Sequence, residues 1–224
     1  MLIASETALY EFDLGSGEQT YLQALEADNS ETRSNDGRAD RWGGFWIGTM
    51  GKHAEPKVGA IYRYWKGTLR KVVSNVSVSN AICFDPHAPI AYYTDTHTKK
   101  VMRQPLDIET GWPVGKPDLH LDLNEDGLNP DGAVTDTIGN LWIAEWASFR
   151  VSCYDGSGTR IDTVSTGAAQ SSCPAWGGPE LRDLYITSAA VGLSAEHKTA
   201  HPDTGKTFVA RNAGQGRPEP KVIL

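Results

Sequence analysis

Three short polar motifs stand where the ends of predicted strands meet. They are residues 33–37 (Arg-Ser-Asn-Asp-Gly), 79–82 (Ser-Asn-Ala-Ile) and 129–132 (Asn-Pro-Asp-Gly), and each directly precedes an apolar, strand-like run. Their amide and carboxylate oxygens are the donors that hard divalent cations prefer. In a radial β-architecture the inner ends of different sheets face one axis, so such residues converge there. The motifs therefore predict a metal-dependent enzyme rather than a generic β-protein.

A repeated apolar-aromatic run indicates which elements position these motifs. Anchored on Trp46, Tyr93, Trp142 and Tyr185, the runs follow one another at steps of 47, 49 and 43 residues. Residues 2–5 fit the same slot 44 residues before Trp46. A period of about 40–50 residues that holds several strands is typical of a propeller blade. We expect about five such units.

The segments between these runs predict hairpins. Apolar and polar residues tend to alternate, and glycine-containing turns separate the strands, as in residues 60–73 and 151–158. No long stretch has a helical period, so helix should be minor. With 224 residues, 39% of them hydrophobic, the chain is long enough to bury one core. We therefore predict an all-β protein with a single domain over residues 1–224.

Composition narrows the range of partners. The net charge of −7 gives no support to binding of nucleic acid or an anionic membrane. No apolar run is long enough to span a membrane, and Met1 does not begin a signal peptide. Cys83, Cys153 and Cys173 are odd in number and lack zinc spacing, so we interpret them as free thiols of a cytoplasmic protein.

Four ordered motifs resemble the signature of the SMP-30/gluconolactonase (regucalcin-like) family. They are residues 33–50, 79–82, 130–144 and 177–179, and the resemblance extends from about residue 2 to residue 190. The resemblance implies a six-bladed β-propeller that uses one divalent cation to hydrolyse sugar lactones. The cation expected is Ca²⁺, Zn²⁺, Mn²⁺ or Mg²⁺.

The resemblance also assigns roles to individual residues. Asn80 and Asp131 match two metal ligands of the family, and Asp131 matches its acid/base. Arg33 and Asn35 match substrate-binding positions. The implied mechanism has a metal-activated water attack the lactone carbonyl, with Asp131 taking and returning the proton. Arg33 would hold a hydroxyl or the developing oxyanion.

Two departures from the family pattern affect this interpretation. Relatives carry an upstream blade whose glutamate is a third metal ligand, and this chain opens at a strand of the second blade. We therefore expect a propeller that is incomplete at its N-terminus, because the chain is a piece of a longer protein or because a partner closes the ring. Such a chain should bind metal weakly, hydrolyse lactones slowly or not at all, and tend to associate. In addition, His53 occupies the place of an acidic substrate contact, and we expect Glu55 to replace that contact.

Other interpretations stay open. Each motif taken alone is an ordinary turn signal, and Asp36 is expected to serve the turn rather than the metal. Residues 122–127 imitate the start of an EF-hand, but the twelfth position is Ala133 rather than glutamate. His197 and His201 have helical spacing, yet we expect a loop because Pro202 and a glycine follow. The alternatives to a lactonase are a non-catalytic propeller that binds metal or a partner, and an esterase or phosphotriesterase of the same fold. The sequence does not fix the oligomeric state.

Overall fold

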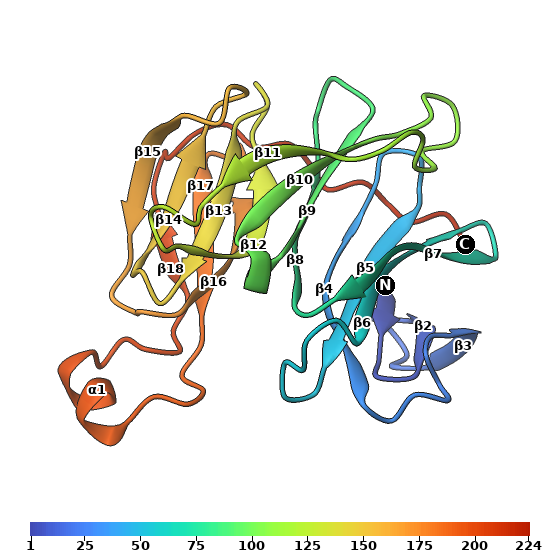
Figure 1. Cartoon of the computed structure of the whole chain (residues 1–224), viewed down its shortest axis with the longest axis horizontal. Coiled ribbons are helices and arrows are strands. Elements are labelled where there is room, and N and C mark those ends of the chain that lie inside the picture. Colours follow the sequence, from blue (N-terminus) through green and yellow to red (C-terminus); the bar gives the residue numbers. More distant parts are fainter.

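The computed structural model describes residues 1–224, and nearly all of its regular structure is antiparallel β-sheet (Figure 1). Five sheets follow one another along the chain. The first contains β1 (Leu2–Ala4), β2 (Ala8–Phe12) and β3 (Gln19–Ala24). The second contains β4 (Thr32–Ala39), β5 (Phe45–Gly51), β6 (Gly59–Trp65) and β7 (Thr68–Val76). The third contains β8 (Ser79–Phe84), β9 (Ile90–Asp95), β10 (Lys100–Pro105) and β11 (Asp118–Asp122), with the 3-10 helix η1 (Thr96–Thr98) after β9.

The chain ends in two further sheets. The fourth contains β12 (Asn129–Thr135), β13 (Leu141–Trp146), β14 (Arg150–Tyr154) and β15 (Arg160–Ser165). The fifth contains β16 (Ser171–Gly177), β17 (Asp183–Ser188) and β18 (Phe208–Ala210). The single α-helix, α1 (Ala195–Ala200), lies between β17 and β18. No helix combines the length and apolar character that crossing a bilayer requires. The predicted all-β class with about five blades is confirmed.

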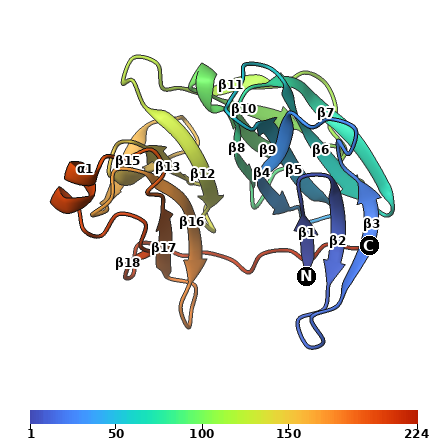
Figure 2. The same cartoon turned by 90° about the horizontal axis from the view of Figure 1, so that it is seen from below.

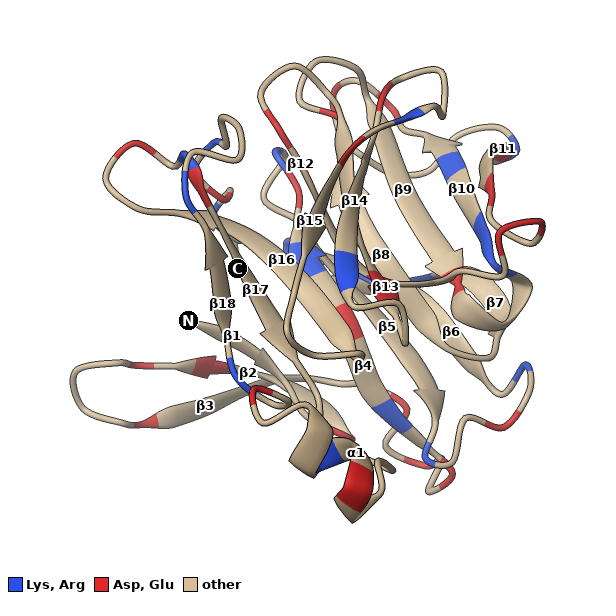
Figure 3. Ribbon diagram, turned by 90° about the vertical axis from the view of Figure 1, so that its left-hand side faces the viewer, with Lys and Arg blue, Asp and Glu red and all other residues tan.

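The strands β4, β8, β12 and β16 line the axis of the molecule. Each begins its sheet, and β4 contacts β8, β8 contacts β12, and β12 contacts β16 (Figure 2). Acidic and basic residues are interspersed over the strands and loops, and no sheet is covered by one sign of charge (Figure 3). The sheets are therefore blades packed around a common axis, and side chains that leave the inner strands toward that axis meet one another.

Four apolar clusters hold adjacent sheets together. One cluster lies between each pair of neighbours from the first sheet to the fifth. Trp46 and Trp142 are 0% and 3% exposed within these clusters, so both are core residues. Each indole donates to an aspartate six residues earlier, Asp40 or Asp136, over 3.1 and 3.2 Å. In the second and fourth blades, a turn aspartate thus fixes the buried tryptophan of the repeat.

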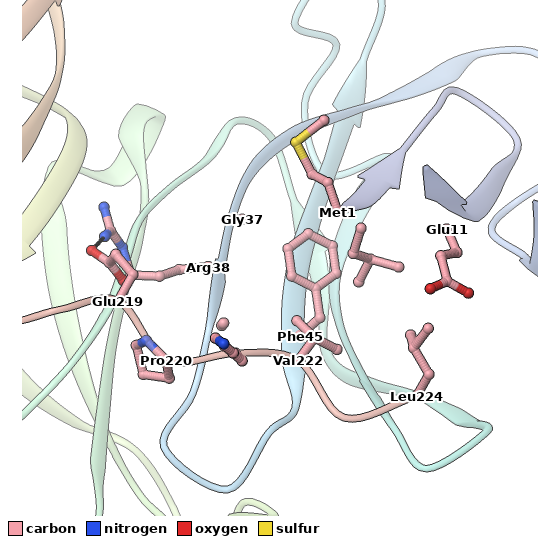
Figure 4. A pocket seen from close by; sticks show the side chains of 12 residues that line it. Met1, Glu11, Gly37, Arg38, Phe45, Glu219, Pro220, Val222 and Leu224 are labelled. Atoms are coloured by element: carbon pink, nitrogen blue, oxygen red, sulfur yellow. Dashed lines mark hydrogen bonds and ion pairs between the residues drawn. The ribbon is translucent and has the colours of Figure 1, made fainter. Parts of the chain in front are cut away.

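The first sheet differs from the others at the axis. The anchor residues of the repeat lie in the second strand of their sheets, and residues 2–5 fit that same slot in β1. In the other four sheets an inner strand lies next to the axis. In the first sheet that position is a cavity of about 750 Å³ beside β4 (Figure 4). Its wall includes Leu2, Phe45 and Val222, and its charged pair, Arg38 and Glu219, is already joined as an ion pair.

The C-terminal segment crosses the end of the axis where the inner strands finish. The amide of Thr137 donates to the carbonyl of Gln215 over 2.8 Å, and Arg217 Nη2 donates to the carbonyl of Phe84 over 2.9 Å. The amide of Ile223 then donates to the carbonyl of Gly43 over 2.8 Å. The segment therefore ties the fourth, third and second sheets in turn.

The prediction of a loop around His197 and His201 is wrong. Helix α1 forms there, and the side chain of Ser194 caps it by accepting from the amide of His197 over 3.1 Å. Pro202 follows the last turn and so does not interrupt it. The two imidazole rings consequently lie 4.6 Å apart, against Phe149.

Candidate functional site

A bulge in each inner strand coincides with each polar motif. The register with the next strand shifts between Ser34 and Gly37 in β4, between Asn80 and Cys83 in β8, and between Pro130 and Ala133 in β12. A bulge adds a residue to one strand and redirects its side chains. The sequence motifs are thus the points at which three strands turn polar groups toward the axis.

Hydrogen bonds join these groups across three sheets. Asn35 Nδ2 donates to the side-chain oxygen of Asn80 over 3.1 Å and to the carbonyl of Ser79 over 2.9 Å. Asn80 Nδ2 donates to Thr96 Oγ1 over 2.9 Å, and that hydroxyl donates to the carbonyl of Pro130 over 2.7 Å. Asn80 is therefore held by its neighbours on both sides, next to the residue that precedes Asp131.

Asp131 lies in a narrow hollow of about 160 Å³ with Asn35, Asp36 and Asn80. Burial, followed by the nearby charge of Asp36, raises the pKa of Asp131 to about 8. Burial also raises the pKa of Asp36, whose carboxylate accepts from the amide of Ile82 over 2.8 Å. Two carboxyl groups sharing a desolvated place repel one another, so a cation there would relieve both costs.

Above this hollow the axis widens into a cavity of about 580 Å³. Arg33, Asn35, Asn80 and Asp131 all line it, so four of the five predicted site residues share one cavity. Arg33 Nη1 donates to Asn35 Oδ1 over 3.0 Å, which ties the guanidinium to the network below. Residues that follow β5, lie in η1, end β13 or follow β17 complete the wall at the open end; they are Lys52, His53, His97, Trp146 and Val191.

Glu55 does not line either hollow. Its carboxylate accepts from the amide of His53 over 3.0 Å, and a side chain on Gly51 would collide with it. The hydrogen bond from the amide of His53 holds the Glu55 carboxylate within its own turn. His53 rather than Glu55 therefore lines the cavity. The expected acidic substrate contact therefore has no counterpart at this place.

Sequence reasoning missed the contribution of the fifth sheet. In β16 the register shifts between Ser171 and Cys173, as in the other inner strands, and Ser172 and Cys173 line the hollow around Asp131. Ser172 follows Asp131 by 41 residues, about one repeat unit, and that spacing was the available signal. Thr96 was also missed, because a threonine after a strand has no distinctive pattern.

The donor set fits a hard divalent cation. Asn80 offers an amide oxygen and Asp131 a carboxylate, and both face the same small hollow. No three His, Cys, Asp or Glu side chains are arranged so that they could hold a metal ion together. The site therefore favours an oxygen-ligated ion over a thiolate- or imidazole-ligated one.

The chain is similar to several known proteins in sequence and in structure. Residues 1–190 match the model of the SMP-30/Gluconolactonase/LRE-like region. The chain is 35% identical over 220 residues to the L-arabinolactonase of Azospirillum brasilense. The aligned region covers 96% of this chain and 72% of that protein. It is 33% identical over 222 residues to the 6-deoxy-6-sulfogluconolactonase of Pseudomonas putida. That aligned region covers 98% of this chain and 75% of that protein. The crystal structure of a calcium-binding protein, regucalcin, from Agrobacterium tumefaciens matches at a TM-score of 0.97 and 39% identity, over 100% of this chain and 76% of that one.

Proposed function

Because this chain belongs to the SMP-30/gluconolactonase/LRE-like family, we propose that it is a hydrolase that opens sugar lactones. Two of its relatives are named as lactonases of sugar substrates. The observation that carries the proposal is the convergence of Arg33, Asn35, Asn80 and Asp131 on one axial cavity. Carboxylate, amide and guanidinium groups at one place supply a proton acceptor, oxygen ligands and a donor for developing negative charge.

Asp131 is the proposed acid/base. Burial and the charge of Asp36 make this carboxyl group a better proton acceptor than an ordinary aspartate in the metal-free protein, with a pKa of about 8. In the proposed reaction its carboxylate form takes a proton from the attacking water and returns it to the leaving hydroxyl. A divalent cation held by Asn80 and Asp131 would act as a Lewis acid toward the lactone carbonyl. Asn35 fixes the orientation of Asn80 through their shared hydrogen bond.

Arg33 and Asn35 are the proposed substrate-binding residues. The guanidinium of Arg33 is half-buried at the cavity wall and already donates to Asn35 Oδ1. Its remaining N–H groups point to a role in holding a sugar hydroxyl or the oxyanion that forms as water attacks. Because both residues belong to β4, they present a rigid pair rather than a mobile loop.

A second candidate function is metal or partner binding without catalysis. The observation that favours it is the small number of metal ligands. Asn80 and Asp131 supply two, whereas a cation such as Ca²⁺ takes six or more. Lactone turnover separates the two candidates, because a purely binding protein has none.

The test is hydrolysis of D-glucono-1,4-lactone and L-arabinono-1,4-lactone, followed by proton release with Ca²⁺, Zn²⁺, Mn²⁺ or Mg²⁺ added in turn. Metal-dependent turnover that disappears in Asp131→Asn and survives in Asp162→Asn supports the proposal, since Asp162 is exposed on the outer strand β15. Metal binding without turnover supports the second candidate. Turnover of a nitrophenyl ester with no turnover of lactones would instead indicate an esterase.

A further inference from the structure

The cavity above Asp131 has a basic wall in an acidic protein. The chain carries a net charge of −7. The basic and imidazole side chains that line the cavity are Arg33, Lys52, His53 and His97, whereas Asp131 is the only acidic one. Asp131 lies at the narrow end among the proposed cation ligands. Every charged or imidazole side chain at the wide end is therefore one that carries or accepts positive charge.

Three of these groups come from one wall. Arg33 in β4 pairs with Met50 in β5, and Lys52 and His53 follow directly after β5 ends. The guanidinium of Arg33 donates only to neutral acceptors, the carbonyl of Ser34 and the side chain of Asn35, and no carboxylate lies within ion-pair distance of it. Its charge is therefore available to a ligand.

Lys52 has a partner that a ligand can displace. Its ammonium lies 2.5 Å from the carboxylate of Glu6, and the two side chains are 37% and 51% exposed. Exposed ion pairs contribute little free energy, because water screens both charges. Glu6 does not line the cavity, so the ammonium can serve a ligand inside it without leaving the wall.

We propose that the site prefers sugar lactones that carry a carboxylate on the carbon remote from the lactone carbonyl. This inference rests on the proposed lactonase function and specifies its substrate class. The carbonyl end of the substrate approaches Asn80 and Asp131, and the carboxylate end lies against Lys52 and His53 of this wall. A neutral sugar receives only ordinary hydrogen bonds from that wall, whereas a carboxylate receives charge-assisted ones, which are stronger.

The test compares two lactones that differ in one group. D-glucaro-1,4-lactone carries a carboxylate at the sixth carbon, where D-glucono-1,4-lactone carries a hydroxymethyl group. We expect kcat/KM for the glucarolactone to exceed that for the gluconolactone by about tenfold at low salt, with the ratio falling at 0.5 M NaCl as charges are screened. In Lys52→Gln/His53→Gln the ratio should fall by about threefold or more. The matched control, Lys71→Gln, removes a charge from the outer strand β7 and should keep the ratio.

A ratio near one in the unmodified protein, or the same ratio in Lys52→Gln/His53→Gln, overturns the inference and leaves the lactonase function standing. If neither lactone is hydrolysed, the proposed function fails. Calorimetric titration then still measures whether the protein binds the glucarolactone more tightly than the gluconolactone. Tighter binding of the glucarolactone that weakens in Lys52→Gln/His53→Gln supports the inference. Equal binding of both lactones rejects it.

Discussion

The side-chain nitrogen of Asn35 donates to the side-chain oxygen of Asn80 over 3.1 Å, and this contact joins the inner strands of two blades at the axis. One residue is a proposed substrate contact and the other a proposed cation ligand. An amide that is held by a neighbour loses less freedom when it binds an ion. The contact therefore links the placement of the substrate to the placement of the cation.

The first prediction removes this contact. Asn35→Ala leaves Asn80 without the donor that orients it, so we expect affinity for the divalent cation to fall about tenfold, as for other losses of groups that orient a ligand. Calorimetric titration with Ca²⁺ and Mn²⁺ measures the change. Asn124→Ala, which removes hydrogen bonds in an exposed loop, should keep the affinity. Unchanged affinity in Asn35→Ala would show that Asn80 is held by Thr96 alone.

The second prediction concerns pH. The pKa of Asp131 is about 8 in the folded protein and near 3.8 for an ordinary aspartate. Between these pH values the folded state holds a proton that the unfolded state has lost, so the free energy of unfolding of the metal-free protein should fall as pH rises from about 4 to about 8. The stabilisation is complete below that window and absent above it.

Urea unfolding with EDTA at pH 5 and pH 8.5 measures this effect. Other groups titrate in the same range, so the readout is the difference between the unmodified protein and Asp131→Asn, which should have the flatter profile. Since a cation must displace the same proton, metal affinity should rise with pH until about pH 8. Parallel stability profiles for the two proteins would contradict a raised pKa at Asp131.

The third prediction uses two arginines that stack on one tryptophan. The guanidinium carbons of Arg63 and Arg70 lie 4.5 and 4.6 Å from the ring centre of Trp112. Arg63 is fully buried and pairs with buried Asp40 over 2.6 Å, whereas Arg70 is exposed. Arg63→Met leaves a buried carboxylate without its cation and should lower the free energy of unfolding by about 3–5 kcal/mol. Arg70→Met should lower it by no more than about 1 kcal/mol. Similar losses in urea unfolding for both variants would mean that burial of the Asp40 pair has no consequence for stability.

Much of the fold was predictable because corresponding strands of successive blades carry an aromatic residue at the same position, which in two blades is a buried tryptophan. Trp46 and Trp142 each need a turn aspartate six residues earlier, so their spacing repeats in the sequence as it does in space. The convergence of Asn35, Asn80 and Asp131 was predictable for the same reason, since the three residues occupy corresponding bulges of successive inner strands. A repeat in structure leaves a repeat in sequence wherever one slot demands one kind of side chain.

The remaining features depend on contacts that spacing does not encode. Glu55 has a suitable charge at a suitable distance along the chain, but a hydrogen bond from the amide of His53 holds it in its turn. Ser172 and Thr96 reach the site through backbone geometry that any small polar residue can follow. Helix α1 was missed because Pro202 was interpreted as a break, although it stands beyond the last turn.

The last prediction tests how closely the fourth and fifth blades approach at the site. A Cβ atom on Gly132 would lie 2.7 Å from Cys173 Sγ and 2.8 Å from the carbonyl oxygen of Ser172. Gly132→Ala must therefore push β12 and β16 apart beside Asp131. This should lower the free energy of unfolding by about 2 kcal/mol. It should also lower kcat for lactones, so that kcat/KM falls by more than the rise in KM alone explains. Gly156→Ala is the matched control, because a Cβ there meets no atom within 4 Å. Thermal unfolding and lactone kinetics measure both variants. If Gly132→Ala keeps full stability and turnover, the fifth blade has room to move without disturbing Asp131, and Ser172 and Cys173 are no part of the site.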